Sequence, residues 1–186
     1  MRLNKGSVII FPTDTVYGIG AKINDSLALN KIYELKNRPK EKRLAVLCGS
    51  LEHIETIAYL SLSAKKLIDR YMPGALTVIL KTKEEYQNEF IFETVGVRIP
   101  NHPLALEILK ENGPMATSSV NISGEIPLND YNEICALYSE KVDFIYSNSL
   151  KPSLVSSTIV DLTTDSCHLI REGDIKFDEI IKFLNN

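Results

Sequence analysis

Hydrophobic and polar residues alternate along the chain in short blocks that predict strands and helices in turn. Aliphatic or β-branched runs, bounded by Pro, Gly or polar residues, predict strands at 7–11, 44–48, 76–80, 95–99, 114–118, 144–147, 157–162 and 167–172. Apolar residues that recur every three or four positions predict helices at 26–38, 50–59, 63–71, 103–112, 130–138 and 177–184. The segment PTDTVYGIG, between the first strand and the first helix, is predicted to be a loop.

The intermixing of strands and helices, without a linker or repeat, predicts a single domain over 1–186 of the α/β or α+β class, with a mixed sheet. With 186 residues, 44% hydrophobic and 24% charged, the chain is typical of a soluble globular protein. It has no apolar run of the roughly 20 residues that span a bilayer, and its start lacks a signal-peptide pattern. We therefore expect a cytoplasmic protein without a membrane partner.

Several familiar kinds of site are disfavoured by the sequence. Cys48, Cys135 and Cys167 stand far apart in apolar segments, without zinc-type spacing, so we expect reduced core cysteines and no metal ligands. The P-loop, G-x-G-x-x-G and G-x-S-x-G patterns are absent. The common nucleotide-binding folds and triad hydrolases are therefore unfavoured.

The charge is concentrated in one short segment. The net charge is −3, yet KNRPKEKR, residues 36–43, carries five cations and one Glu. A solvated helix face is the usual explanation for such a run. Pro39 ends the helix and places the cations on a loop, so an anion-binding loop is an equally good interpretation.

Polar side chains cluster where predicted strands begin or end. The residues are Thr13, Asp14, Thr15, Arg98, Thr117, Ser118, Ser119, Asn121, Ser156, Ser157, Thr158 and Arg171. Such residues often only form turns. Several clusters together with a cationic loop nevertheless favour a ligand site at the ends of the strands.

Seven motifs in order connect these clusters to a known family. FPTDTVYGIG, KNRP, MPGALTVIL, VRIPNHPL, TSSVNISG, STIVDL and IREG resemble the YrdC/TsaC family of threonylcarbamoyl-AMP synthases over nearly the whole chain. Lys36, Arg38, Ser119 and Asn121 resemble that family's K-x-R and S-x-N tetrad. The resemblance implies a twisted mixed β-sheet with flanking helices around a concave, positively charged cavity.

The resemblance also implies a reaction. L-threonine, bicarbonate and ATP would give threonylcarbamoyl-AMP and pyrophosphate, with Mg²⁺ assisting. A separate transferase would then use the product to modify the tRNA adenosine next to the anticodon. The residue chemistry agrees, because an anionic carbamate that attacks a polyanion needs positioning and charge neutralisation more than a general base.

Site residues carry over from the motifs by position. The catalytic tetrad would be Lys36, Arg38, Ser119 and Asn121, and all four, together with Arg171, would contact ATP. Lys42 and Thr94 match weaker nucleotide positions. The threonine-binding positions correspond to Thr15, Arg98, Thr117 and Ser157. Arg98 would pair with the substrate carboxylate, and the alternative for Arg98 is a structural ion pair at a strand end.

The chain departs from the family pattern at three points. Leu47 stands where longer relatives often have a histidine that contacts threonine, and Ala75 replaces a second proline in the PGP turn. The N-terminal helix and the extra C-terminal domain of longer relatives are expected to be missing. The resemblance is therefore to the short, single-domain branch.

Two other functions remain open from the sequence. One is a non-catalytic protein that binds double-stranded RNA or tRNA through the same cations, since Lys and Arg contact phosphates of both ATP and RNA. The other is a carbamoyl-transfer enzyme that acts on a different amine. The hydroxyl clusters favour a small-molecule pocket over an RNA surface, where aromatic or further basic residues are expected.

Overall fold

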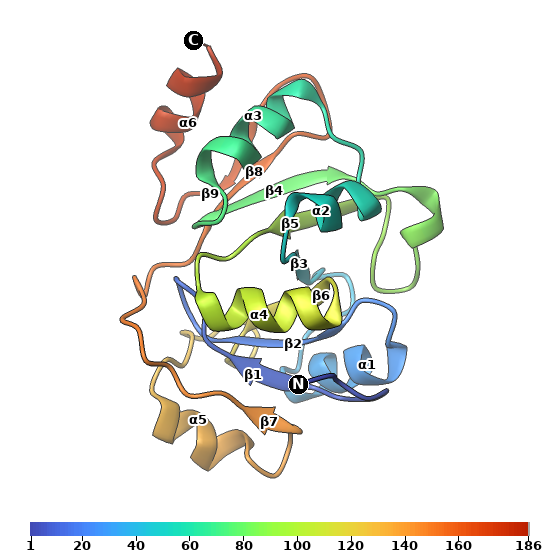
Figure 1. Cartoon of the computed structure of the whole chain (residues 1–186), viewed down its shortest axis with the longest axis vertical. Coiled ribbons are helices and arrows are strands. Elements are labelled where there is room, and N and C mark those ends of the chain that lie inside the picture. Colours follow the sequence, from blue (N-terminus) through green and yellow to red (C-terminus); the bar gives the residue numbers. More distant parts are fainter. Residues whose placement is uncertain (186) are drawn as a thin grey trace.

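A twisted nine-stranded mixed sheet organises the computed structural model, which describes residues 1–185 (Figure 1). The strand order is β7-β1-β2-β6-β3-β5-β4-β8-β9. The strands are β1 (Ile9–Phe11), β2 (Gly18–Lys22), β3 (Ala45–Leu47), β4 (Leu76–Lys81), β5 (Thr94–Arg98), β6 (Met115–Ser119), β7 (Phe144–Ile145), β8 (Thr158–Asp161) and β9 (His168–Arg171). The mixed-sheet prediction is confirmed.

Six α-helices flank the sheet within the described residues. They are α1 (Ser26–Leu35), α2 (Leu51–Ile57), α3 (Leu62–Tyr71), α4 (Pro103–Asn112), α5 (Tyr131–Tyr138) and α6 (Phe177–Leu184), with a 3₁₀ turn η1 (Glu84–Tyr86). Side-chain oxygens of Asp25, Ser50, Ser61 and Asp130 accept backbone N–H groups at four helix starts, which stabilises the first turn. None of these helices is long and apolar enough to cross a bilayer.

The core lies on both faces of the sheet because alternate strand residues point to opposite sides. In β1, Ile9 and Phe11 pack with α4, whereas Ile10 packs on the other side with the cluster that contains α1. Figure 1 shows α4 crossing one face of the sheet, with α5 and β7 at one end and α6 beside α3 at the other.

Strand β2 corrects the prediction of a loop through Gly20. Its sequence GIGAK lacks a β-branched run, so the local pattern did not indicate a strand. The two glycines have a packing reason. A Cβ at Gly18 would lie 2.7 Å from Cγ2 of Thr117. A Cβ at Gly20 would lie 2.7 Å from Oγ1 of Thr117. Glycine therefore lets β2 pair closely with β6 around Thr117.

The cysteine prediction is only partly right. All three thiols are free, and Cys48 is fully buried, where burial raises its pKa. Cys135 and Cys167 are half-buried instead of lying in the core. Strand β7 is also shorter than the predicted 144–147 run.

Candidate functional site

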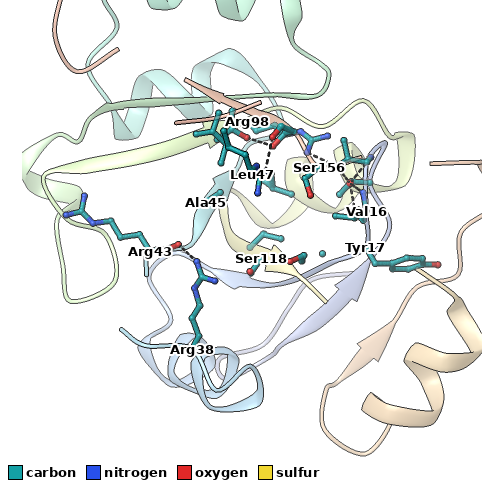
Figure 2. Close-up of a pocket in the computed structure, with 18 residues that line it drawn as sticks. Val16, Tyr17, Arg38, Arg43, Ala45, Leu47, Arg98, Ser118 and Ser156 are labelled. Carbon is teal, nitrogen blue, oxygen red and sulfur yellow. Dashed lines mark hydrogen bonds between the residues drawn. The ribbon is translucent and has the colours of Figure 1, made fainter. Parts of the chain in front are cut away.

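A cavity of about 240 Å³ opens among β2, β3, β4, β5, β6 and β8 (Figure 2). Four arginines line it: Arg38, Arg43, Arg98 and Arg171. Eight serine and threonine side chains also line it: Thr13, Thr15, Thr77, Thr117, Ser118, Ser119, Ser156 and Ser157. No Asp, Glu or His is among the lining residues within 1–185. The arrangement therefore offers hydrogen-bond donors and cations to a ligand.

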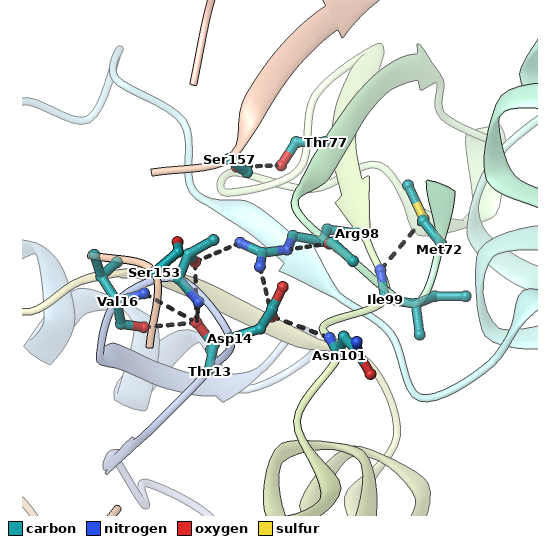
Figure 3. A network of polar contacts seen from close by, with 12 residues as sticks. Thr13, Asp14, Val16, Met72, Thr77, Arg98, Ile99, Asn101, Ser153 and Ser157 are labelled. Carbon is teal, nitrogen blue, oxygen red and sulfur yellow. Dashed lines mark hydrogen bonds and ion pairs between the residues drawn. The ribbon is translucent and has the colours of Figure 1, made fainter. Parts of the chain in front are cut away.

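Arg98 ends β5 and is only 5% exposed. Its Nε donates to the carbonyl of Gly74 at 2.8 Å, its Nη1 to Oγ1 of Thr15 at 2.8 Å, and its Nη2 to Oδ1 of Asp14 at 2.6 Å (Figure 3). Burial lowers the pKa of Arg98, and Asp14 acts in the opposite direction. A guanidinium has five N–H groups, so two remain for a ligand.

Hydroxyl groups from four segments of the chain line the cavity together with Arg98. Oγ1 of Thr13 lies 3.1 Å from Oγ1 of Thr15 in the loop after β1. Oγ1 of Thr77 and Oγ of Ser157 are 2.8 Å apart, which joins β4 to the start of β8. Oγ1 of Thr117 donates to the carbonyl two residues earlier, at 3.1 Å. These side chains form the polar part of the cavity, which we call the deep pocket.

The end of α1 directs Arg38 to the cavity. Asn37 has a left-handed backbone with φ of 46°, a conformation that Asn tolerates better than most residues. The N–H of Asn37 donates to the carbonyl of Glu34, and that of Arg38 to the carbonyl of Tyr33. This pair of bonds closes many helices. Lys36 is then buried, while Arg38, two residues further, lines the cavity.

Arg38 and Arg171 lie in the outer part of the cavity, beyond the deep pocket around Arg98. Their guanidinium groups are held by hydrogen bonds to backbone carbonyls. Nε of Arg38 donates to the carbonyl of Lys42 at 2.8 Å, and its Nη2 to that of Arg43 at 2.7 Å. Nη2 of Arg171 donates to the carbonyl of Ser157 at 2.8 Å. Burial lowers the pKa of Arg38 and of Arg171, but arginine stays charged in proteins. These cations have no carboxylate partner among the ion pairs of residues 1–185.

Arg43 and Thr77 line the cavity but were not predicted from the sequence. Arg43 is the cation of the two. Its guanidinium lies over the ring of Phe92, 4.6 Å from the centroid, and Nη1 donates to the hydroxyl and carbonyl oxygens of Thr94. Stacking on an aromatic face orients an arginine without neutralising it. The available signal was the cationic run 36–43, of which only Lys36, Arg38 and Lys42 were selected.

Lys36 is 1% exposed and does not line the cavity. Its Nζ donates to the carbonyl of Ser119 at 2.5 Å, to the carbonyl of Asn121 at 2.7 Å and to Oδ1 of Asn121 at 2.8 Å. Burial, with a smaller contribution from nearby Arg38, lowers the pKa of Lys36 to about 8. The tetrad is thus brought together, with Lys36 behind the cavity wall.

The cavity contains seven of the residues predicted for the site: Thr15, Arg38, Arg98, Thr117, Ser119, Ser157 and Arg171. Four others, Lys36, Lys42, Thr94 and Asn121, are not part of its lining. The ion pair considered for Arg98 is present, with Asp14. The roles of all eleven residues in binding remain predictions.

An apolar wall faces the hydroxyls. Ala45, Leu47 and Ile159 line the cavity together with Val16. Leu47 therefore presents a hydrocarbon surface to the cavity. A ligand atom against this wall is held by apolar contact and not by a hydrogen bond.

Comparisons with known proteins identify the family. The family described as "Sua5_yciO_yrdC: Telomere recombination" matches residues 1–173. The chain is 34% identical to "Threonylcarbamoyl-AMP synthase" of Bacillus subtilis over 96% of its length and 53% of that relative. The structure of Pyrococcus abyssi Sua5 complexed with L-threonine matches with a TM-score of 0.89 and 33% identity, over 96% of this chain and 54% of that one.

A shorter neighbour has the same fold. The crystal structure of Escherichia coli YciO matches with a TM-score of 0.82 and 30% identity, over 92% of this chain and 85% of that one. The mixed sheet with its flanking helices is thus the architecture of a known class. The chain belongs to the Sua5/YciO/YrdC family.

Proposed function

We propose that this protein is a threonylcarbamoyl-AMP synthase, which makes threonylcarbamoyl-AMP and pyrophosphate from L-threonine, bicarbonate and ATP. The observation that carries the proposal is the pairing of two sites in one cavity. A buried arginine with two spare N–H groups lies among hydroxyls, and three arginines without carboxylate partners lie beside it. The named relative from Bacillus subtilis supports the assignment.

L-threonine occupies the deep pocket in this proposal. The two spare N–H groups of Arg98 bind its carboxylate, since charge-assisted pairs with arginine are strong and directional. Thr15, Thr117 and Ser157 recognise the substrate hydroxyl, and the methyl group lies against Leu47. The P. abyssi neighbour, whose structure contains L-threonine, supports threonine as the ligand.

ATP lies across the outer part of the cavity, with Arg38, Arg43 and Arg171 on its phosphates. The threonine amine and bicarbonate form a carbamate and release one water molecule. A carboxylate oxygen of the carbamate then attacks the α-phosphorus. A new P–O bond forms as the bond to the leaving pyrophosphate breaks. The arginines lower the barrier by neutralising the charge of both anions and holding them in line.

Mg²⁺ enters with ATP in this scheme. Protein sites for Mg²⁺ generally supply one or two carboxylates in addition to substrate phosphates. The lining of the cavity within 1–185 has no carboxylate, and the described residues contain no group of three or more His, Cys, Asp or Glu placed to hold a metal. Phosphate oxygens and water would therefore carry the ion, with Ser or Thr hydroxyls as the available protein oxygens.

The product is an activated carbamoyl group, which a separate transferase would place on the tRNA adenosine next to the anticodon. A cytoplasmic location follows from that role. The proposal is tested by pyrophosphate release from ATP and Mg²⁺, with threonine and bicarbonate omitted in turn. Release that needs both supports it. Release without either, or RNA binding with no release, contradicts it and favours the RNA-binding alternative.

A further inference from the structure

We propose that Lys36 is a positioning residue that builds the Ser119–Asn121 turn and does not itself contact the nucleotide phosphates. This inference rests on the proposed function, because it concerns how the ATP end of the cavity is assembled. It separates the K-x-R pair into two roles: Arg38 touches the ligand, and Lys36 shapes the wall behind it.

The donors of Lys36 are fully used. A lysine ammonium has three N–H groups, and three oxygens of the 119–121 turn accept from Nζ at 2.5, 2.7 and 2.8 Å. The side chain is 1% exposed and lies outside the cavity lining. A phosphate could bind Lys36 only after one of these bonds breaks and leaves a buried oxygen unpaired, which is costly.

The main chain of Lys36 holds the same turn. Its carbonyl accepts the N–H of Ser123 at 2.8 Å, and the N–H of Val120 donates to the carbonyl of Tyr17 at 3.1 Å. Nδ2 of Asn121 donates to the carbonyl of Glu125, which fixes the orientation of the amide. The turn is therefore anchored both by the residue that follows α1 and by the residue that precedes β2.

The fixed position of Asn121 determines in which direction the hydroxyl of Ser119 donates its proton. Oδ1 of Asn121 accepts from Lys36 and also from the hydroxyl of Ser119, at 2.7 Å. A serine hydroxyl has one proton, so Ser119, which lines the cavity, presents only lone pairs to a ligand. Such an oxygen suits a donor, such as a ribose hydroxyl or the adenine amino group. It does not suit an ionised phosphate oxygen, which can only accept.

The position also predicts a pH response. The pKa of Lys36 is lowered from its ordinary 10.5 to about 8 by burial and by Arg38, the nearby cation on the same segment. From the facing turn only neutral oxygens reach the ammonium. Above pH 8 the amine keeps two N–H groups for three acceptors, so the turn loosens and ATP affinity falls.

Binding of inorganic tripolyphosphate and of ATP, measured by calorimetry at pH 7, distinguishes contact from positioning. Arg38→Ala should weaken both ligands at least tenfold. Lys36→Met should weaken ATP several-fold and leave tripolyphosphate within about twofold of wild type. An equal loss of tripolyphosphate affinity in the two variants would overturn the proposal. Lys36→Arg should not restore ATP binding, because the planar guanidinium cannot reproduce three convergent bonds.

A second measurement uses the wild-type chain in case Lys36→Met does not fold. In a ¹⁵N-lysine-labelled sample, the Lys36 ammonium should give a slowly exchanging signal that titrates near pH 8. Saturating tripolyphosphate should leave that signal in place, while a large shift indicates direct contact and refutes the inference. ATP that binds without pyrophosphate release refutes the synthase function alone. A protein that binds no ATP refutes both proposals.

Discussion

The deep and outer parts of the cavity hold their arginines in different ways. Arg98 is buried, and two of its three bonds go to side chains, those of Asp14 and Thr15. Arg38 and Arg171 are held by backbone carbonyls and have no carboxylate partner among the ion pairs of residues 1–185. The first arrangement fixes one geometry for a small ligand, whereas the second keeps net charge available for a polyanion.

The two regions should therefore respond differently when an arginine is removed. In the deep pocket, removing one partner leaves the other charge largely desolvated, so stability and binding fall together. In the outer region, removing Arg38 weakens ligand binding but costs little stability. Water can then donate to the exposed carbonyls that the arginine leaves.

The largest effect is expected for Arg98→Met. The change leaves Asp14 without its cation, and we expect a loss of about 3 kcal/mol in unfolding free energy, since the Asp14 side chain is only 18% exposed. Threonine binding should disappear. Denaturant unfolding and calorimetry measure the two effects. An unfolding free energy equal to wild type would show that the pair is not the structural element described here.

Arg38→Ala should affect binding alone. Loss of a charge-assisted contact of roughly 1.5–3 kcal/mol corresponds to about 10–100-fold weaker ATP binding. The thermal midpoint should stay close to that of wild type. Arg70→Ala is a control, because it also removes one arginine side chain, and Arg70 is not part of the cavity lining. Unchanged ATP affinity in Arg38→Ala would remove the phosphate assignment.

Substrate selectivity tests the hydroxyl pocket. Valine matches threonine in shape but lacks its hydroxyl, so an unpaired polar group should cost about 1–3 kcal/mol, or roughly 10–100-fold in kcat/KM. Serine loses only a methyl group, worth roughly 1 kcal/mol, and should be the better of the two poor substrates. Pyrophosphate release with each amino acid is the assay. Equal rates with valine and threonine would rule out recognition through the hydroxyl.

The smallest effect is expected for Arg43→Ala. Its guanidinium is exposed and oriented by Phe92 and Thr94, so we expect ATP affinity to fall by about twofold to fivefold, in the range of solvent-screened contacts. The loss should shrink at high salt. Arg43→Lys should recover part of the affinity. If Arg43→Ala binds ATP as well as wild type at low salt, Arg43 does not contact ATP, and only Arg38 and Arg171 remain as its cationic contacts.

Local patterns were sufficient for most elements of the fold. The cap residues Asp25 and Ser50 and the stop at Pro39 are short-range signals, and the helices begin and end near them. Strand β2 was not predicted because its glycines, which are poor strand formers, are explained only by its close pairing with β6. The clearance that Gly18 and Gly20 give Thr117 is a contact across about a hundred residues of sequence, which a local pattern cannot contain.

Sequence alone was enough for most of the element types, for the cationic run and for the residues that the family motifs select. The tertiary structure alone decided which of them share a surface. Lys36 and Arg38 are two positions apart and equally cationic in sequence. The left-handed turn at Asn37 sends one into a cage of three oxygens and the other into the cavity. The physical reason is that burial and hydrogen-bond partners come from segments more than eighty residues away, such as Ser119 for Lys36 and Asp14 for Arg98.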